Sequence, residues 1–269
     1  MGERIKVLIT VKTYPSPSKK HEETVCTAGV REDGSFVRLY PVDYRNRPYH
    51  QWYKKYQWIE LEASKHPKDP RPESLRPLGE IKVLGPPIST AANWLERRKY
   101  ILTRPRFTMC ELNERNQKEI SLAIVKPKLV QEFVYEKVAR QWKPEWEAQM
   151  RQYKLFGPDK KPLEKIPYKF SYVFKCEELK CKGHKMMIED WEIGELYRKI
   201  RDQSGDENIA CQKVRDKFFG QICAEDKDTY FFVGTVLKHG TWIVLGTFYP
   251  KKENEKDIIQ HNDLPKLPF

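Results

Sequence analysis

The sequence predicts an α+β protein rich in strands, with a pair of helices and a C-terminal β-hairpin in its second half. Short β-branched and aromatic runs alternate with proline-rich or glycine-rich turns through the first half. Apolar residues recur at helical spacing over 190–203 and 208–222. Two further apolar runs at 230–236 and 241–249 are joined by a short turn and form the predicted hairpin.

Composition and charge restrict the functional classes. The 269 residues include 50 Lys and Arg against 38 Asp and Glu, which gives a formal net charge of +12. Such a charge attracts polyanions, so nucleic acid is the partner class that we expect first. The apolar share of 39% and the charged share of 33% indicate a folded protein with no membrane partner. Residues 1–13 lack the apolar run and the small-residue cleavage site typical of a secretory signal, and the cysteines are irregularly spaced. We therefore expect reduced thiols and a cytoplasmic location.

The first quarter of the chain is expected to form strands. They cover 4–11, 24–30, 35–42 and 58–63. Asp33-Gly34 lies between the second and third strands, and this pair favours the positive φ values of a tight hairpin. The stretch 65–77 contains four prolines, so we expect no regular structure there. Later strands are expected at 81–84, 122–125, 129–138 and 168–175, and further helices at 90–99 and 142–155.

Aromatic and basic residues alternate from Tyr40 to Trp58. Rings of this kind can stack against bases while cations meet phosphates, as in proteins that bind single strands. We therefore predict a nucleic-acid interface here, with the alternative that the rings close the core of a small barrel. The predicted stacking residues are Tyr44, Tyr49, Trp52 and Tyr53, and the predicted phosphate contacts are Lys12, Arg38, Arg45, Arg47, Lys54 and Lys55.

The chain is expected to divide into two domains and a tail. Residues 1–156 form the basic and aromatic strand-rich domain, and residues 168–250 form a second α+β domain. The segment 157–167 between them contains three prolines among charged residues, which favours an irregular joint. The tail 251–269 is rich in charge and proline, so we expect it to be loosely held.

A short loop before the predicted helix pair carries potential metal ligands. Cys176, Cys181 and His184 lie within nine residues, and Gly183 permits a tight turn before the histidine. Thiolates and imidazole suit zinc, but a structural zinc site needs four ligands. One interpretation is a bound zinc with Cys211 as the fourth ligand, for which Cys223 and Asp190 are alternatives. The other is that these cysteines are small buried apolar residues that hold no metal. Without a metal the loop is a surface turn, and Cys26 and Cys110 are expected to be packing residues.

The same region offers a catalytic alternative. His184, Asp190 and Glu192 could hold Mg²⁺ as in a metal-dependent nuclease. Ordinary helix chemistry explains two of them, because Asp190 can cap the helix and Glu192 suits its first turn. The sequence contains no nucleophile elbow, Walker loop, dinucleotide fingerprint or HExxH motif. We therefore expect a binding protein rather than an enzyme.

Several segments resemble the dual OB-fold domain family of uncharacterised bacterial proteins. The resemblance lies in KVLITVKTYP, TVCTAGV, FVRLYPV and SLAIVKPK. It implies OB-like elements, namely two small five-stranded barrels with the helices inserted or appended, and binding of single-stranded DNA or RNA on an open barrel face. The Cys/His loop and the helix pair depart from a bare OB barrel. A further alternative is a protein-interaction subunit of a bacterial defence or nucleic-acid-processing complex.

Overall fold

The computed structural model describes residues 2–103, 106–115, 118–156 and 162–253. Strands outweigh helices in these residues, in agreement with the predicted class. The predicted tail 251–269 lies almost entirely outside them, as does the start of the predicted joint 157–167. No helix in the described part is long and apolar enough to cross a membrane.

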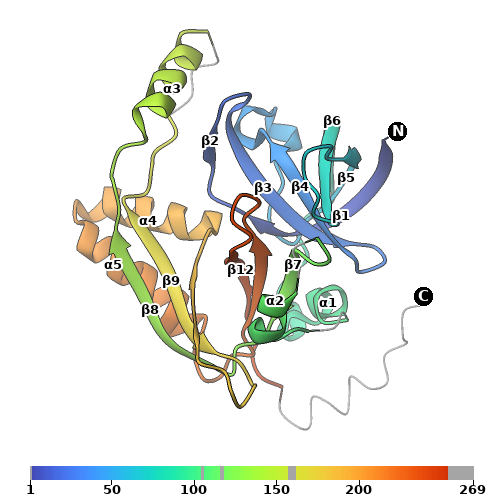
Figure 1. Cartoon of the computed structure of the whole chain (residues 1–269), viewed down its shortest axis with the longest axis vertical. Coiled ribbons are helices and arrows are strands. Elements are labelled where there is room, and N and C mark those ends of the chain that lie inside the picture. The colour runs from blue at the N-terminus through green and yellow to red at the C-terminus, as the bar shows by residue number, and fades with distance from the viewer. Residues whose placement is uncertain (1, 104–105, 116–117, 157–161, 254–269) are drawn as a thin grey trace.

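Five strands of the first half close into a ring (blue to cyan in Figure 1). They are β1 (Glu3–Lys12), β3 (Glu22–Arg31), β4 (Phe36–Val42), β5 (Trp58–Lys65) and β6 (Ser74–Leu84). The pairings run β1–β3, β3–β4, β4–β6, β6–β5 and β5–β1, and only β4–β6 is parallel. The short β2 (Ser16–Ser18) pairs with the start of β3. The four strands predicted before residue 64 are confirmed.

The ring holds together because alternate side chains of its strands point inward. Its interior is a core of aliphatic and tyrosine side chains, among them Val7, Leu39 and Tyr53. The predicted hairpin between β3 and β4 is confirmed, and Gly34 has the positive φ of 77° that its turn requires. Gly29 permits the close approach of β1, because a Cβ there would lie 2.1 Å from the Leu8 carbonyl oxygen.

The prediction of irregular structure over 65–77 was wrong at its end. β6 begins at Ser74, two residues after Pro72, and continues through Pro77. Here the strand pairs with β5 on one side and, through Ser74 and Leu75, with β4 on the other. Pairing with two neighbours outweighs the local preference of proline, which depends on context in sheets.

The second half contains two three-stranded antiparallel sheets. One sheet consists of β7 (Leu122–Val125), β11 (Tyr230–Thr235) and β12 (Trp242–Phe248). The other consists of β8 (Leu129–Lys137), β9 (Tyr168–Lys175) and β10 (His184–Met187). A parallel bridge between Ile188 and Val244 joins the two sheets. The strand pairings therefore cross the boundary that we expected at residue 156, because β7 and β8 both pair with later strands.

The predicted helix pair covers one side of these sheets (orange in Figure 1). α4 (Trp191–Ser204) is capped by Asp190, whose carboxylate accepts from the Glu192 N–H, and it ends at Gly205. α5 (Glu207–Arg215) continues into a π-helical turn, η3 (Asp216–Gln221). The predicted helices over 190–203 and 208–222 are thus confirmed, the second with a widened last turn.

The remaining helices are short or peripheral. They are η1 (Tyr44–Asn46), η2 (Tyr49–Gln51), α1 (Ala91–Ile101), α2 (Met109–Glu114) and α3 (Pro144–Phe156). α3 projects beyond the rest of the molecule in Figure 1. α2 was not expected, and a capping box between Thr108 and Glu111 starts it.

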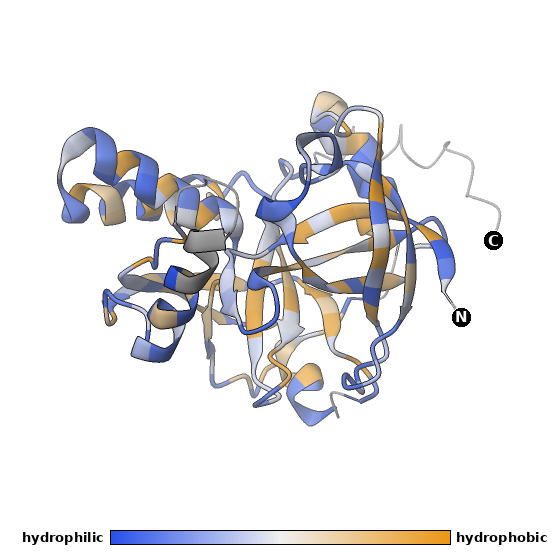
Figure 2. Cartoon of the chain, turned by 90° about the horizontal axis from the view of Figure 1, so that it is seen from above, coloured by the Kyte–Doolittle hydropathy of each residue, from blue (hydrophilic) through white to orange (hydrophobic). Residues whose placement is uncertain are grey.

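Three hydrophobic cores tie the molecule together. One fills the ring, a second lies between the ring and the β7–β11–β12 sheet, and a third lies between the sheets and the helix pair. The second core joins Leu8 of β1 and Tyr56, which lies just before β5, to Phe232 and Phe248 of the sheet. In Figure 2 the strands carry most of the apolar residues, while loops and outer helices are largely hydrophilic. The two halves therefore share a packed interface.

Candidate functional site

A cleft of about 410 Å³ lies where the ring meets the second half. We call it the junction cleft. Cations and aromatic rings dominate its walls, which come from β1, the segment before β5, α1, the start of α4 and the end of β12. The lining residues are Lys12, Lys54, Lys55, Tyr56, Pro87, Thr90, Trp94, Arg97, Trp191, Glu192, Thr247 and Tyr249.

Lys12, at the end of β1, holds its ammonium between two rings. The Nζ atom lies 4.2 Å from the centroid of Tyr44 and 4.4 Å from that of Trp191. Among the described residues it has no hydrogen-bond or ion-pair partner. Burial and the neighbouring ammonium of Lys55 lower the pKa of Lys12 to about 8. A cation placed against rings and lacking an anionic partner is suited to bind an anion from solution.

Lys55 differs from Lys12, because it is neutralised within the fold. Its Nζ atom lies 2.8 and 2.7 Å from the two carboxylate oxygens of Asp190 and 3.2 Å from Oε2 of Glu192. Burial disfavours the ammonium, but these two carboxylates outweigh it and raise the pKa of Lys55. The ion pair between Lys55 and Asp190 connects the first half to the start of α4. Because two carboxylates already neutralise the Lys55 ammonium, it is not available to bind a ligand.

A second wall of the junction cleft consists of aromatic rings and the guanidinium of Arg97, which is stacked on two of them. The Arg97 guanidinium lies 3.8 Å from the Tyr56 ring centroid and 4.8 Å from that of Trp94. Its Nε and Nη2 donate to the Ile88 carbonyl at 2.8 and 2.6 Å, which fixes its orientation. Trp94 also packs edge-on against Tyr249, with 4.9 Å between centroids. The wall is thus a rigid aromatic surface with a positive charge.

The structure separates the ten predicted interface residues into three groups. Lys12, Lys54 and Lys55 line the junction cleft. Tyr49 and Trp52 are 84% and 39% exposed. Their side-chain rings lie on the outside of the ring of strands, with 5.8 Å between the two centroids.

The remaining five are engaged within the fold. Arg38, Tyr44 and Tyr53 are buried, and a buried side chain cannot meet a nucleic acid in this conformation. The Arg38 guanidinium donates to Ser74 and Ser121 and so joins the ring to the second half. The last two form ion pairs, Arg45 with Glu23 at 3.1 Å and Arg47 with Asp43 at 2.8 Å.

The sequence analysis missed the cleft residues that come from other segments. Trp94, Arg97 and Trp191 were assigned only to helices, and Tyr249 only to the last strand. Their sequence positions show no common spacing. Only the packing of the second half onto the ring brings them to Lys12.

A second cluster of polar groups includes Cys176 and Cys181 of the third core, and none of its members lines the junction cleft. The ligand atoms of Cys110, Cys176, Cys181 and His184 all lie within 4.8 Å of one another. The His184 Nε2 atom is 3.5 Å from the sulfur of Cys110 and 3.3 Å from each of the other two sulfurs. In a tetrahedral zinc site, bonds of about 2.3 Å to sulfur and about 2.0 Å to nitrogen place these atoms about 3.5 Å apart. The cluster can therefore hold a metal ion.

Local structure orients these ligands. The Met109 N–H donates to the Cys176 sulfur at 3.2 Å, and the Cys176 N–H donates to the Cys181 sulfur at 3.3 Å. Burial raises the pKa of Cys181, but hydrogen bonds from the N–H groups of Cys176 and Gly183 outweigh this effect and lower it. Gly183 has a φ of +96°, which confirms the predicted turn before His184. Thiolates with N–H donors are the usual form of cysteine ligands.

The predicted fourth ligand was wrong. Cys211 is fully buried in α5 and is not part of the cluster, whose fourth member is Cys110 on α2. The residues of the catalytic alternative do not lie together either, because His184 is in the cluster while the Asp190 carboxylate accepts a hydrogen bond from Lys55. Among the described residues, no group of three or more close metal ligands includes Asp190 or Glu192.

Comparison with known families divides the chain near residue 104. One family model, described as a domain of unknown function (DUF8757), matches residues 105–263, more than half of the chain. The chain belongs to the DUF8757 family. A second model, also a domain of unknown function (DUF8758), matches residues 3–103, which contain the ring. The DUF8757 match contains both three-stranded sheets, the metal cluster and the helix pair.

Other comparisons add little to this family assignment. No curated protein matches the sequence. Among solved structures, a murine DNA-binding protein bound to double-stranded DNA is 8% identical, with 94% of this chain and 97% of that chain covered. The TM-score is 0.32, which is below the level at which a common fold can be inferred.

Proposed function

We propose that this protein binds single-stranded DNA or RNA at the junction cleft. The observation that carries the proposal is the Lys12 ammonium, which lies between two aromatic rings and has no anionic partner among the described residues. A phosphate is a suitable partner for such a group, because its charge and its acceptor oxygens match an ammonium. The net charge of +12 favours the approach of a polyanion.

The aromatic lining supports a nucleic acid over a free phosphate. Trp94, Trp191 and Tyr249 line the same cleft as Lys12 and Lys54. Each base stacked on a ring contributes about 1–3 kcal/mol in proteins of this kind. Duplex DNA presents its bases only by their edges, so stacking favours an unpaired strand. The exposed side chains of Tyr49 and Trp52 would provide further stacking positions for the nucleic acid on the outside of the ring of β-strands.

The ring supports the same proposal through its topology. A closed ring of five strands with one parallel pair agrees with an OB-like barrel, and such barrels commonly bind single strands. We therefore propose an OB-like barrel for residues 3–84. The proposed interface lies at its contact with the second half, not on an isolated face.

A salt titration tests the proposed function. Binding of a fluorescently labelled single-stranded oligonucleotide should weaken with salt, with a log–log slope of about −0.7 per phosphate contacted. Two or three contacts give a slope of about −1.4 to −2. A duplex of the same sequence should bind more weakly. Absence of affinity for any strand at low ionic strength, or co-purification with a stoichiometric protein instead, would contradict the proposal.

We also propose that the metal cluster holds one zinc ion with a structural role. Three sulfurs and one imidazole nitrogen form a closed set of four, which leaves no open position for a substrate. The ligands come from α2, the end of β9, the following loop and the start of β10, so the ion would fasten α2 to a hairpin. Elemental analysis should find one zinc per chain in protein purified without chelators. Protein that folds with no bound metal would contradict this proposal.

A further inference from the structure

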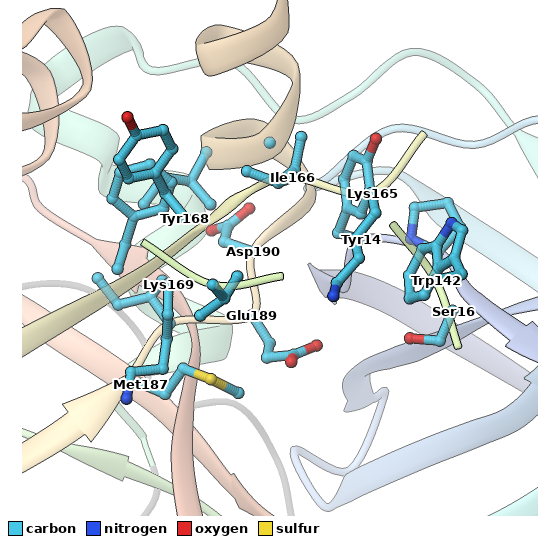
Figure 3. Close-up of a pocket in the computed structure, with 16 residues that line it drawn as sticks. Tyr14, Ser16, Trp142, Lys165, Ile166, Tyr168, Lys169, Met187, Glu189 and Asp190 are labelled. Atoms are coloured by element: carbon cyan, nitrogen blue, oxygen red, sulfur yellow. The ribbon is translucent and has the colours of Figure 1, made fainter. Parts of the chain in front are cut away.

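A second hollow lies on the other side of the start of α4 from the junction cleft. Its volume is about 370 Å³, which falls in the range of small-molecule pockets. The turn before β2 forms one wall, and the ends of β8, β9 and β10 with the start of α4 form the others. Figure 3 shows this hollow, which we call the Glu189 pocket.

The walls of the Glu189 pocket are mainly apolar and include four aromatic rings, two of which are held in place by hydrogen bonds. The Trp142 indole N–H donates to the Leu163 carbonyl at 3.2 Å, and the Tyr14 hydroxyl donates to the Glu164 carbonyl at 3.0 Å. The Tyr14 ring also packs directly on Gly194, where a Cβ would lie 2.4 Å from it. Rings fixed in this way offer a preformed surface to a flat ligand.

Glu189 provides a carboxylate that the fold does not use. Its backbone N–H donates to the Val244 carbonyl at 2.8 Å, which fixes the position of the residue. Within the described residues its carboxylate has no hydrogen-bond or ion-pair partner. In Figure 3 the carboxylate points into the space between Ser16 and Trp142 on one side and Met187 on the other. Burial without a counter-charge raises the pKa of Glu189 to about 7.

The adjacent residue, Asp190, carries a carboxylate with a structural role, and its hydrogen bonds contrast with those of Glu189. Asp190 caps α4 and forms an ion pair with Lys55, so both of its oxygens are satisfied. A partly buried carboxylate without partners costs free energy that a ligand with matching donors can recover. The contrast indicates that Glu189 is available for a ligand.

The chemistry of the pocket restricts that ligand. Two carboxylate oxygens accept best from two parallel N–H groups, and aromatic walls select a flat group. Guanine presents two adjacent donors on its Watson–Crick edge, whereas cytosine and adenine each present one donor next to an acceptor. A guanidinium group has similar donors, but Lys165 also lines the pocket and disfavours a cation, whereas the charge of Lys169 is compensated by Glu136.

We propose that the Glu189 pocket binds a guanine base, whose N1–H and N2–H groups donate to the two carboxylate oxygens. This inference rests on the proposed function and makes it selective. Trp191 connects the two sites, since its ring lies 4.4 Å from the Lys12 ammonium and 6.3 Å from the Tyr14 ring. A single strand thus places one guanine beside Glu189 and its phosphates at Lys12.

Free nucleosides test the pocket independently of phosphate binding. Guanosine and inosine differ only in the N2 amino group. The ratio of their affinities, obtained by ligand-observed NMR titration, therefore measures the contribution of that one donor to binding. Wild-type protein should bind guanosine about tenfold more tightly than inosine, or about 1.4 kcal/mol. The Glu189→Gln variant should lose this preference, because its amide offers one acceptor and one donor. Glu62→Gln, with the same charge change on the exposed side of the ring, should keep it.

The outcomes separate the pocket from the proposed function. Equal affinity for both nucleosides in wild type, or an unchanged preference in Glu189→Gln, overturns the pocket assignment. Displacement of guanosine by methylguanidinium at equal concentration also overturns it, in favour of a basic protein side chain. An all-thymidine strand should bind wild type and Glu189→Gln equally, which shows that the variant is folded. If that strand fails to bind while guanosine binds, the proposed function fails and the pocket stands.

Discussion

The metal cluster and the junction cleft both gather polar side chains from distant segments, but they differ in what they leave unsatisfied. In the cluster, each of the three cysteine sulfurs lies 3.3–3.5 Å from the Nε2 atom of His184, and the four groups complete a closed set. In the cleft, Lys55 is paired with Asp190, while the ammonium of Lys12 meets only aromatic rings. A closed set stabilises the fold, whereas an open one is available for a ligand.

Breaking the closed set should have the largest effect. Cys110→Ser removes one of the four proposed ligands, and apparent binding free energies of structural zinc are about 10–16 kcal/mol in small peptides. We expect loss of most bound zinc and a fall in stability of several kcal/mol. Cys211→Ser is the matched control, because Cys211 is buried outside the cluster. Elemental analysis and thermal unfolding measure both effects. Equal zinc loss in the two variants would show that Cys110 is not a ligand.

The ion pair between the two halves is the next test. Lys55→Met leaves the buried carboxylate of Asp190 without a counter-charge, and breaking such a pair typically costs about 3–5 kcal/mol. Urea unfolding should show this loss, while Lys54→Met, an exposed lysine beside it, should change the free energy of unfolding little. Similar effects of the two substitutions would mean that the pair does not hold the ring to α4.

Neutralising the open cation should affect binding without affecting stability. Lys12→Gln removes one phosphate contact, so affinity for a single strand should fall about tenfold, or about 1.4 kcal/mol. The salt slope should become shallower by about 0.7. Lys6→Gln is the control, because Lys6 lies on the same strand with its ammonium near Glu32 outside the cleft. Equal losses in both variants would indicate a general effect of net charge.

The smallest expected effect is a dependence on pH. The pKa of Lys12 is lowered to about 8, so the free protein carries a neutral amine above this pH. Binding to phosphate needs the ammonium, so affinity should be constant below pH 8 and fall as pH rises through it. The charged groups near Lys12 are Lys55, Asp190, Glu192 and Glu195. Lys12→Arg keeps its charge and should remove the fall. A similar fall in that variant would assign the titration to another group.

Local patterns in the sequence predicted most elements but not their assembly. The hairpin at Asp33-Gly34 and the capped helix after Asp190 depend on neighbouring residues, and both are present. Closure of the ring depends on the parallel pairing of β4 with β6, which local periodicity does not encode. The buried position of Arg38 has the same origin, because its partner Ser121 lies far along the chain.

The two sites show the same limit. Cys176, Cys181 and His184 were predicted because they lie close in sequence. Cys110 was not, because it lies on a six-residue helix too short to show a periodic pattern. Lys12 was predicted from its charge, but Trp191 joins it only through packing of the two halves.

Photo-crosslinking tests most directly whether the open set of groups is the nucleic-acid interface. A single strand carrying 5-iodouracil, irradiated with the wild-type protein and mapped by peptide mass spectrometry, should form links at Tyr56, Trp94 or Trp191, which line the junction cleft. Links confined to the exposed pair Tyr49 and Trp52, or no links with a bound strand, would contradict the assignment.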